Sequence, residues 1–498
     1  MMTLVVASLV ERGVAGVSRS SKRAFDAGAD LVEVRLDHIR NIDRNERLIH
    51  EARAAAEGPA IATLRSAGEG GRSQSKGKAR HALLREIADA GFEYIDIESA
   101  RDGPMLEQLM SSGRRSRTIA SFHFAKPATK ERVRVRLKRG LTEADVSKVA
   151  MPCENAAQAV VLAELALELA KEPKPFALMG MGIQGQLTRA CASGMGSKFV
   201  YACLEGHEAA PGQLEIRTQT RLLDKDRVVL GLIGHPVSHS VSKPMQEAAL
   251  RSAGMSGIYL PLDIPPRSMN KAIVDTLFDI GFDGLNVTVP NKHKAYLICD
   301  TRRSSAEASK AVNTLWRRRR KIVGDNTDLI GFGRLLESKK IRVADAETLV
   351  VGAGGAARAA CRVLSDKGAN VTVAARRAKP AEETARMCRG RHKVISSLRA
   401  PGESYDLVVN ATPIGTAGTA DERSNLPVCV LRNARVFVDL VYNPSETLSM
   451  RIAKSHGCKV HGGLEMLVRQ GEAAFEIWTG ISPDVAKMRQ AARKAVSR

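Results

Sequence analysis

Two lysines lie in strand-like segments where a charged side chain has no evident structural use. Lys148 is in the middle of residues 146–150, and Lys292 ends the stretch 286–292. Burying an ammonium group in apolar surroundings is costly, and it lowers the pKa of the amine. A lysine with a lowered pKa can form a Schiff base or transfer a proton near neutral pH. The two lysines therefore predict two active sites.

The first half of the chain alternates short β-rich runs with helical stretches, which implies parallel βα units. For residues 1–218 the leading form of such units is a closed (β/α)8 barrel. The expected strands are Thr3–Leu9, Leu31–Leu36, Ala60–Leu64, Tyr94–Ile97, Thr118–Phe122, Val146–Ala150 and Phe176–Met179. Functional residues of such barrels lie at the carboxyl ends of the strands.

The second of these strands carries three charges with a period of two. Glu33, Arg35 and Asp37 share one face, while Val32 and Val34 share the other and face the helices. Charges on the interior side of a barrel need a reason. An internal salt-bridge cluster is one interpretation, and a substrate site is the other.

Further polar side chains follow the later strands of this half. They are Arg65, Glu69, His123, Lys148, Arg189 and Gln213. Each is a weak signal alone, since a single histidine at a strand end is more often structural. Together with Glu33 and Arg35 they suit a Schiff-base lyase that acts on a small carboxylated ketone. In their order along the chain these motifs resemble type I 3-dehydroquinate dehydratase over the whole first half.

The resemblance implies a role for each of these residues. Lys148 would form an imine with the C3 ketone, and His123 would remove the C2 proton and later protonate the departing hydroxyl. Glu69 would be the auxiliary acid near the histidine. The substrate-binding positions would be Glu33, Arg35, Arg65, Arg189 and Gln213.

Two positions depart from this family. Phe124 follows the histidine where the family usually has Asp, and Ala209 stands where the family has Ser near a lid. The first change predicts an altered orientation of His123, and the second predicts a lost contact to the substrate. We expect slower turnover or weaker binding, with function retained.

The second half begins after a polar stretch, residues 216–227, which we expect to be an exposed linker. A new strand starts at Val228 and ends in the hydroxyl-rich turn 235–244. That turn suits a polyol or a carboxylate at a helix N-terminus, and a serine-rich N-cap is the alternative. Residues 286–292 are predicted to be a strand with Asn286, Thr288 and Lys292 on one face.

Residues 347–358 are predicted to form a strand, a glycine turn and a helix, with a second strand at 369–373. These flanks make the turn at 352–357 a dinucleotide fingerprint. Its glycines let the backbone approach a pyrophosphate at the helix N-terminus. The second strand is followed by Arg376 and Arg377 and by no acid, which favours the 2′-phosphate of NADP over the 2′-hydroxyl of NAD.

Together with residues 410–415, 439–444 and 463–470, these motifs resemble shikimate dehydrogenase throughout the second half. The resemblance implies that Lys292 and Asp328 are the proton-transfer pair beside the reacting carbonyl. The substrate would be held by Ser240, Ser242, Asn286, Thr288, Asn313, Tyr442 and Gln470. NADP would be held by Gly352, Ala353, Gly354, Gly355, Ala356, Arg376, Arg377, Thr412 and Gly463.

This half also departs from its family at a few positions. Lys243 replaces a proline, and Gln246 with Glu247 replaces His-Asn. At the 2′-phosphate, Ala375 and Arg377 replace Asn and Thr. The lost Asn predicts a weaker ribose contact, and the added arginine predicts stronger selection of the phosphate.

The composition bounds the possible partners. The 498 residues are 44% hydrophobic and 26% charged, which suits two or three globular domains. The net charge of +22 invites nucleic acid, but the basic residues are scattered and aromatics make up only 4%. We therefore expect anionic small molecules and no nucleic acid. The one dense basic run, Arg317–Lys321, is expected to be a solvated hairpin tip.

The eight cysteines show no CxxC pair and no metal-ligand spacing with histidine. We expect free thiols, no metal site and a cytoplasmic location. The first residues lack a basic n-region, and no apolar run reaches membrane-spanning length. Neither a signal peptide nor membrane association is expected, and the oligomeric state is left open.

The expected architecture is α/β: an N-terminal (β/α)8 TIM barrel, then a two-lobed dehydrogenase with a Rossmann NADP domain. The expected domains are the barrel at 1–218, a substrate lobe at 226–328, a Rossmann lobe at 329–470, and a helical segment at 471–498 that returns to the substrate lobe. The resembled families catalyse consecutive reactions, dehydration of 3-dehydroquinate and reduction of 3-dehydroshikimate by NADPH. Their union predicts a bifunctional enzyme of the shikimate pathway.

Two alternatives differ in cofactor or in class. A catabolic quinate/shikimate enzyme would use NAD, and the arginine pair at 376–377 disfavours it. A metabolite-sensing regulator built from such enzymes should have lost its catalytic groups. This chain retains Lys148, His123, Lys292 and Asp328 and carries no appended DNA-binding module.

Overall fold

The computed structural model describes residues 1–498 except 1, 112–115, 238–239, 400–403, 419–425 and 497–498. Contacts divide the chain into two compact units. The first comprises Met1–Val229, Ser256–Ile264 and Ala272–Phe282, and the second comprises Leu230–Met255, Pro265–Lys271 and Asp283–Arg498.

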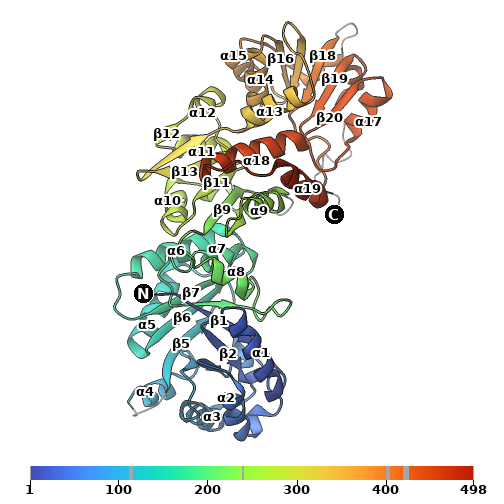
Figure 1. The fold of residues 1–498 in the computed structure, drawn as a ribbon. Helices are drawn as coiled ribbons and strands as arrows, with labels where there is room; N and C mark the ends of the chain where they lie inside the picture. The colour runs from blue at the N-terminus through green and yellow to red at the C-terminus, as the bar shows by residue number, and fades with distance from the viewer. Residues whose placement is uncertain (1, 112–115, 238–239, 400–403, 419–425, 497–498) are drawn as a thin grey trace. The chain divides into compact units, whose positions relative to one another are not determined.

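The first half forms an eight-stranded parallel sheet in the order β7-β6-β5-β4-β3-β2-β1-β8 (Figure 1). Its strands are β1 Leu4–Leu9, β2 Leu31–Arg35, β3 Ala60–Thr63, β4 Tyr94–Glu98, β5 Arg117–His123, β6 Val146–Pro152, β7 Phe176–Met181 and β8 Phe199–Ala202. The backbone N–H of Lys198 donates to the carbonyl of Phe176 at 2.6 Å, which links the two end strands. This nearly closed barrel confirms the predicted fold of the first half.

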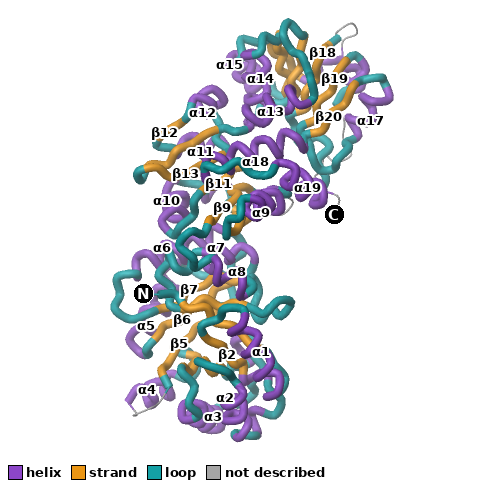
Figure 2. The backbone as a smooth tube through the Cα atoms, viewed as in Figure 1, coloured by secondary structure: helices purple, strands orange, loops and turns teal. Residues whose placement is uncertain are grey.

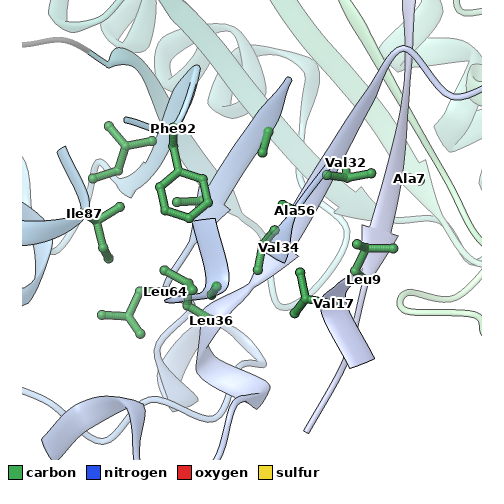
Figure 3. Packing of buried hydrophobic residues seen from close by; sticks show 14 of the residues in the cluster. Ala7, Leu9, Val17, Val32, Val34, Leu36, Ala56, Leu64, Ile87 and Phe92 are labelled. Carbon is green, nitrogen blue, oxygen red and sulfur yellow. The ribbon is translucent and has the colours of Figure 1, made fainter. Parts of the chain in front are cut away.

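Helices follow the strands and lie outside the barrel, as the purple segments of Figure 2 show. They are α1 Val14–Asp26, α2 Arg47–Ala55, α3 Gly77–Asp89, α4 Gly103–Ser111, α5 Lys130–Glu143, α6 Ala156–Leu169, α7 Gln186–Ala190 and α8 Ile216–Arg221. The apolar face of each strand packs against these helices, and Val32 and Val34 lie in that core as predicted (Figure 3). Fully burying such a side chain contributes about 1.5–3 kcal/mol.

Three local predictions for the first half are corrected. The sequence prediction did not include β8. Asp37 does not continue the charged face of β2, because it lies in a short 3₁₀ turn, η1 Leu36–His38. The expected exposed linker contains α8 instead, where Ile216 and Gln219 are buried. Polar composition misled the linker prediction, because these two buried side chains and the following Leu222 suffice to anchor a helix this short.

The substrate-side sheet of the second half has the order β10-β9-β11-β13-β14-β12. Its strands are β9 Val228–Gly234, β10 Gly257–Asp263, β11 Gly284–Val287, β12 Thr301–Arg302, β13 Thr314–Arg318 and β14 Lys321–Asp325. Its helices are α9 Ser242–Ser252, α10 Lys271–Asp279, α11 Lys292–Ile298, α12 Ser304–Ser309 and α13 Asp328–Ser338. The basic run forms the tip of the antiparallel β13–β14 hairpin, as expected, with positive φ at Arg319 and Arg320.

The third sheet is parallel, in the order β17-β16-β15-β18-β19-β20, which is the Rossmann arrangement. Its strands are β15 Glu347–Val351, β16 Asn370–Ala375, β17 Arg391–Val394, β18 Tyr405–Asn410, β19 Ala434–Asp439 and β20 Lys459–Gly462. The helices are α14 Gly355–Asp366, α15 Ala378–Met387, α16 Val428–Arg432, α17 Leu448–Ser455, α18 Leu464–Thr479 and α19 Val485–Val496. Residue Val350 faces the core with α13, α14 and α15, while Leu349 and Val351 face the core with α16 and α17.

The end of the chain packs back on the substrate-side elements. Helix α19 contacts α9, and α18 packs along α13. The indole of Trp478, near the end of α18, donates to the carbonyl of Leu315 on β13 at 3.1 Å.

Candidate active sites

The barrel holds a cavity of about 430 Å³ at the carboxyl ends of its strands. Asp37 does not line this cavity, whereas all eight barrel residues that the sequence assigned a catalytic or binding role do: Glu33, Arg35, Arg65, Glu69, His123, Lys148, Arg189 and Gln213. These eight come from six strands and the segments that follow them. The structure therefore brings the complete set together.

Lys148 lies on β6, and its ammonium is surrounded by charge and π density, not by apolar groups. Its Nζ donates to Asp96 Oδ2 at 2.9 Å and to Glu33 Oε1 at 3.5 Å, and it lies 4.0 Å from the ring centroid of Tyr201. Burial disfavours the charged amine, but the attraction of Asp96, reinforced by Tyr201 and Glu33, raises the pKa of Lys148. The prediction of a lowered pKa was therefore wrong, because the sequence did not reveal the opposing carboxylates.

His123 ends β5 and faces Glu69 across the cavity. The distance from His123 Nδ1 to Glu69 Oε2 is 3.0 Å. Burial raises the pKa of Glu69 to about 7, and burial together with Arg65 and Lys148 holds the pKa of His123 well below its usual value. Glu69 thus fixes the histidine ring although Phe124 replaces the family's usual Asp, so that change leaves the ring with a partner.

Arg189 provides a guanidinium that is charged yet incompletely paired. Its NH1 donates to the carbonyl of Tyr201 at 3.0 Å, whereas its buried Nε has no hydrogen-bond partner among the described residues. Burial lowers the pKa of Arg189 to about 10. A buried cation that lines a cavity and keeps an unused donor is suited to receive a carboxylate.

Gln213 positions the loop that closes one side of the cavity. Its side-chain oxygen accepts from the backbone N–H of Ala209 at 2.9 Å and of Ala210 at 3.2 Å. Its Nε2 donates to Ser8 Oγ at 3.2 Å. The side chain of Ala209 lines the cavity and offers no hydroxyl there.

Sequence reasoning missed Asp96, Glu98 and Tyr201. Asp96 and Glu98 lie on β4, where they alternate with buried Ile95 and Ile97. This is the same period of two that revealed the charges of β2, so the signal was available. Tyr201 could not have been found this way, because its strand was not predicted.

The second half holds a smaller pocket of about 160 Å³. It is lined by all the predicted substrate and proton-transfer residues: Ser240, Ser242, Asn286, Thr288, Lys292, Asn313, Asp328, Tyr442 and Gln470. Two predicted cofactor residues, Ala356 and Gly463, line it as well. Substrate and dinucleotide positions therefore meet at one pocket.

Lys292 and Asp328 form the charged pair of this pocket. The distance from Lys292 Nζ to Asp328 Oδ2 is 2.6 Å. Lys292 does not end a strand as predicted, because β11 stops at Val287 and Lys292 is the first residue of α11. Asp328 likewise begins α13.

Asn313 links this pair to the rest of the pocket. Its Nδ2 donates to Asp328 Oδ1 at 2.8 Å and to Gln470 Oε1 at 3.3 Å. Its own side-chain oxygen accepts from the backbone N–H of Thr327 at 2.8 Å. The amide thus holds Asp328 Oδ1, while Asp328 Oδ2 faces Lys292.

The glycine turn between β15 and α14 has the shape of a phosphate cradle. Gly352 has φ 125°, and a Cβ there would lie 2.8 Å from the carbonyl oxygen of Ala411. A Cβ on Gly354 would meet no atom within 4 Å, so the backbone is open to a ligand, and a Cβ on Gly355 would lie 3.2 Å from Lys292 Cδ. Only glycine tolerates the first of these positions, and the last shows that the turn adjoins the proton-transfer pair.

The residues that would select the adenosine phosphate are exposed. Arg376 and Arg377 directly follow β16, and both are open to solvent. Just after β18, which lies on the other side of β15, Thr412 donates its hydroxyl to Asn410 Oδ1 at 2.6 Å. The glycine turn, the pair Arg376 and Arg377, and the neighbouring pocket therefore fit a phosphorylated dinucleotide.

Among the described residues, no group of three or more His, Cys, Asp or Glu is placed to hold a metal ion. Within the same part of the chain, no helix is long and apolar enough to cross a membrane. The eight cysteines, all within the described ranges, are free.

A barrel with a buried lysine beside a carboxylate–histidine pair, followed by a two-lobed unit with a dinucleotide cradle, defines an enzyme with lyase and dehydrogenase modules. Family comparisons agree with this division. The type I 3-dehydroquinase family matches residues 5–228. The shikimate dehydrogenase substrate-binding domain matches 232–315, the shikimate/quinate 5-dehydrogenase family matches 334–445, and the shikimate 5′-dehydrogenase C-terminal domain matches 463–493.

Individual relatives identify the second module. The shikimate dehydrogenase (NADP(+)) of Archaeoglobus fulgidus is 42% identical over 271 residues, which cover 54% of this chain and 98% of that protein. The enzyme of the same name from Methanocaldococcus jannaschii is 37% identical and covers 53% of this chain and 95% of its own length. A solved shikimate dehydrogenase in complex with NADP+ has 33% identity and a TM-score of 0.51, covering 55% of this chain and 98% of that one.

This chain belongs to the shikimate dehydrogenase family, with a type I 3-dehydroquinase domain preceding the dehydrogenase. Both resemblances drawn from the sequence are thereby confirmed.

Proposed function

We propose that this chain catalyses two consecutive steps of the shikimate pathway. The barrel dehydrates 3-dehydroquinate to 3-dehydroshikimate, and the second half reduces that product to shikimate with NADPH. The observation that carries the proposal is the assembly of each complete residue set around its own cavity, with Lys148 in one and Lys292 in the other.

In the barrel, Lys148 forms an imine with the substrate's ketone, which makes the neighbouring C–H acidic. His123 removes that proton and returns it to the departing hydroxyl, which leaves as water. The low pKa of His123 keeps the imidazole neutral and able to accept a proton, and Glu69 holds the ring from Nδ1. Arg189 pairs with the substrate carboxylate, while Glu33, Arg35, Arg65 and Gln213 contact its polar groups.

In the second half, Lys292 and Asp328 handle the proton on the reacting oxygen. Bound NADPH supplies the hydride. The Lys292 ammonium is placed to donate a proton to the alkoxide, and Asp328 stabilises the ammonium before transfer. The hydroxyls and carboxylate are held by Ser240, Ser242, Asn286, Thr288, Asn313, Tyr442 and Gln470.

The turn Gly352–Ala356, together with Thr412 and Gly463, would hold the dinucleotide. Arg376 and Arg377 pair with the 2′-phosphate, because two guanidiniums and no acid follow β16. The NADP-bound relative and the NADP-dependent relatives support this choice of cofactor. Free cysteines throughout support a reducing, cytoplasmic location.

A coupled assay tests both reactions in one cuvette. Purified protein is given 3-dehydroquinate, and dehydroshikimate absorbance is recorded first without NADPH and then with it. Dehydroshikimate should form at once, and NADPH should be consumed after its addition. Absence of dehydroshikimate would contradict the barrel's assignment, and oxidation of NADH in preference to NADPH would favour the catabolic alternative.

A further inference from the structure

Asp96 lies at the centre of the barrel's charge network. Its side chain is fully buried on β4. The Oδ2 atom accepts from Lys148 Nζ at 2.9 Å. The Oδ1 atom accepts from Arg65 NH2 at 2.8 Å and from Ser121 Oγ at 2.6 Å. Asp96 therefore touches the nitrogen on which the imine forms.

These contacts connect the nucleophile with the acid–base group. Arg65, which binds Asp96, also reaches Glu69 Oε2 through NH1 at 3.2 Å. Glu69 in turn contacts His123. A continuous series of charged contacts thus runs from Lys148 through Asp96, Arg65 and Glu69 to His123, and Asp96 is its link to the lysine.

The other carboxylate near Lys148, that of Glu33, lies farther from the ammonium than Asp96 does. Glu33 Oε1 lies 3.5 Å from the ammonium and accepts from Thr63 Oγ1 at 2.9 Å. Its second oxygen accepts from Ser8 Oγ at 2.9 Å. Asp96 has the shorter contact, and Arg65 together with Lys148 holds the pKa of Asp96 well below its usual range, so it stays anionic.

We infer that Asp96 is a further catalytic residue, the counter-ion of Lys148 and of the imine formed on it. The inference rests on the dehydratase function proposed above. An ammonium and a ketone together yield a protonated imine and one water. The C–N bonds form, the C–O bonds break, and two of the three ammonium protons leave on the carbonyl oxygen as that water.

The charge balance explains why a fixed anion suits this step. One positive charge resides on the lysine nitrogen before imine formation and one after it. A carboxylate fixed at that nitrogen stabilises both forms without reorganising. It also stabilises the cationic imine while the adjacent C–H bond breaks. At that point the imine accepts the electron pair of the broken bond.

Asp96→Asn is the informative variant, since its oxygen can still accept from Arg65 and Ser121. Dehydration should slow by about a hundredfold or more, the scale on which fixed electrostatic groups act. Amidination of Lys148 by methyl acetimidate depends on pH, and the midpoint of that dependence should fall by about one pH unit or more, because the opposing charge is lost. Mass spectrometry of the Lys148 peptide reads the second result directly.

Three comparison proteins separate this role from a structural one. Asp102→Asn removes another buried carboxylate, which pairs with Arg80, and it should leave the amidination profile of Lys148 unchanged. Asp96→Glu keeps the charge and should move that profile back toward the wild type. Glu33→Gln should shift it less than Asp96→Asn does, because its contact with Lys148 is longer.

Borohydride trapping of wild-type protein with 3-dehydroquinate distinguishes the two ways of failing. If the wild-type protein yields no reduced adduct on Lys148, the proposed dehydratase chemistry is contradicted, and so is this inference, which depends on it. If wild type is trapped but Asp96→Asn dehydrates at the wild-type rate, the inference alone is overturned. A slow Asp96→Asn with an unchanged amidination profile also overturns it, since that result marks a structural residue.

Discussion

The two active-site lysines occupy contrasting surroundings. The Lys148 side chain is 4% exposed and meets two carboxylates and an aromatic ring. The Lys292 side chain is 17% exposed and has one carboxylate partner, Asp328. Their cavities differ as well, at about 430 and 160 Å³.

This difference in partners and exposure matches the role proposed for each lysine. A covalent nucleophile carries a cation through several intermediates, so a buried network that holds positive charge in place is useful. A residue that only passes a proton to a neighbouring oxygen needs one partner and a path by which to recover that proton. A single residue type thus serves two chemistries because its neighbours differ.

The strongest test of this contrast is Lys148→Ala. Loss of the covalent nucleophile should lower the dehydration rate by about 10⁴-fold or more, while a residual rate persists from binding alone. Reduction of 3-dehydroshikimate should be unchanged, because that site is separate. Steady-state assays of both reactions on one preparation measure this, with exposed Lys138→Ala as the matched control. Equal loss of both activities would contradict the division of labour.

Lys292→Ala should reverse the pattern. The reduction rate should fall by about 10²- to 10⁴-fold, the usual contribution of a positioned acid or base, and dehydration should not change. Stopped-flow NADPH oxidation is the measurement. Lys367→Ala, which removes a surface lysine paired with Glu337, provides the control. A Lys292→Ala protein with normal reduction would move the proton-transfer role elsewhere.

Glu69 should give the dehydratase a pH dependence that the dehydrogenase lacks. Burial raises the pKa of Glu69 to about 7. The carboxylate form that accepts from His123 Nδ1 thus appears as the pH rises through that value, and the rate should rise with it. Glu69→Gln should abolish this rise of the dehydration rate with pH, the limb of the profile near pH 7. It should lower the rate by at most about a hundredfold, the penalty of a misplaced catalytic group.

Rate profiles between pH 5.5 and 8.5, roughly one and a half units on either side of that pKa, check this prediction. Asp102→Asn, which alters a different buried carboxylate, should keep the limb. A limb that persists in Glu69→Gln would assign the titration to another group.

The Arg376→Ala/Arg377→Ala double variant should affect the second half alone. The KM for NADPH should rise by at least about ten- to a hundredfold, the effect of losing a single hydrogen bond to a charged group at about 1.5–3 kcal/mol. The KM for NADH should change little, because NADH lacks the 2′-phosphate. Parallel titrations of the two nucleotides measure the ratio, and parallel losses for both would count against phosphate selection.

The smallest expected effect concerns the barrel's lid. Ala209→Ser restores a hydroxyl beside the cavity and should lower the KM for 3-dehydroquinate by less than about tenfold, the scale of one neutral hydrogen bond. The kcat should stay the same. Ala209→Val, which adds volume without a hydroxyl, separates the hydrogen bond from packing.

The contrast between the lysines also shows what the sequence could and could not predict. The residues to which motif order assigned substrate or proton-transfer roles line one cavity in each half, because strand ends of a barrel and of a Rossmann sheet converge by topology. The sign of the pKa shift at Lys148 was missed. It depends on Asp96, a residue 52 positions away along the chain, and burial alone points in the opposite direction.

Element boundaries failed where local signals were weak. The segment 286–292 alternates like a strand, yet β11 ends at Val287 and a helix begins at Lys292. Strand β8 spans only Phe199–Ala202, too short for its periodicity to stand out. In both places tertiary pairing, which the sequence does not display, decides the outcome.

Helix α8 has a consequence for how such a protein can be divided. Ile216, Gln219 and Leu222 are buried, and Gln219 Nε2 donates to the carbonyl of Arg189. Past this helix, tight backbone turns lead directly to β9: Asp224 N–H donates to Arg221, and Arg227 N–H to Asp224. A gene cut meant to keep the contacts of this helix must fall after Leu222, and it would still separate the barrel from Ser256–Ile264 and Ala272–Phe282, which belong to the same compact unit. A cut at 215 would also remove Gln219 and with it the hydrogen bond to the carbonyl of Arg189.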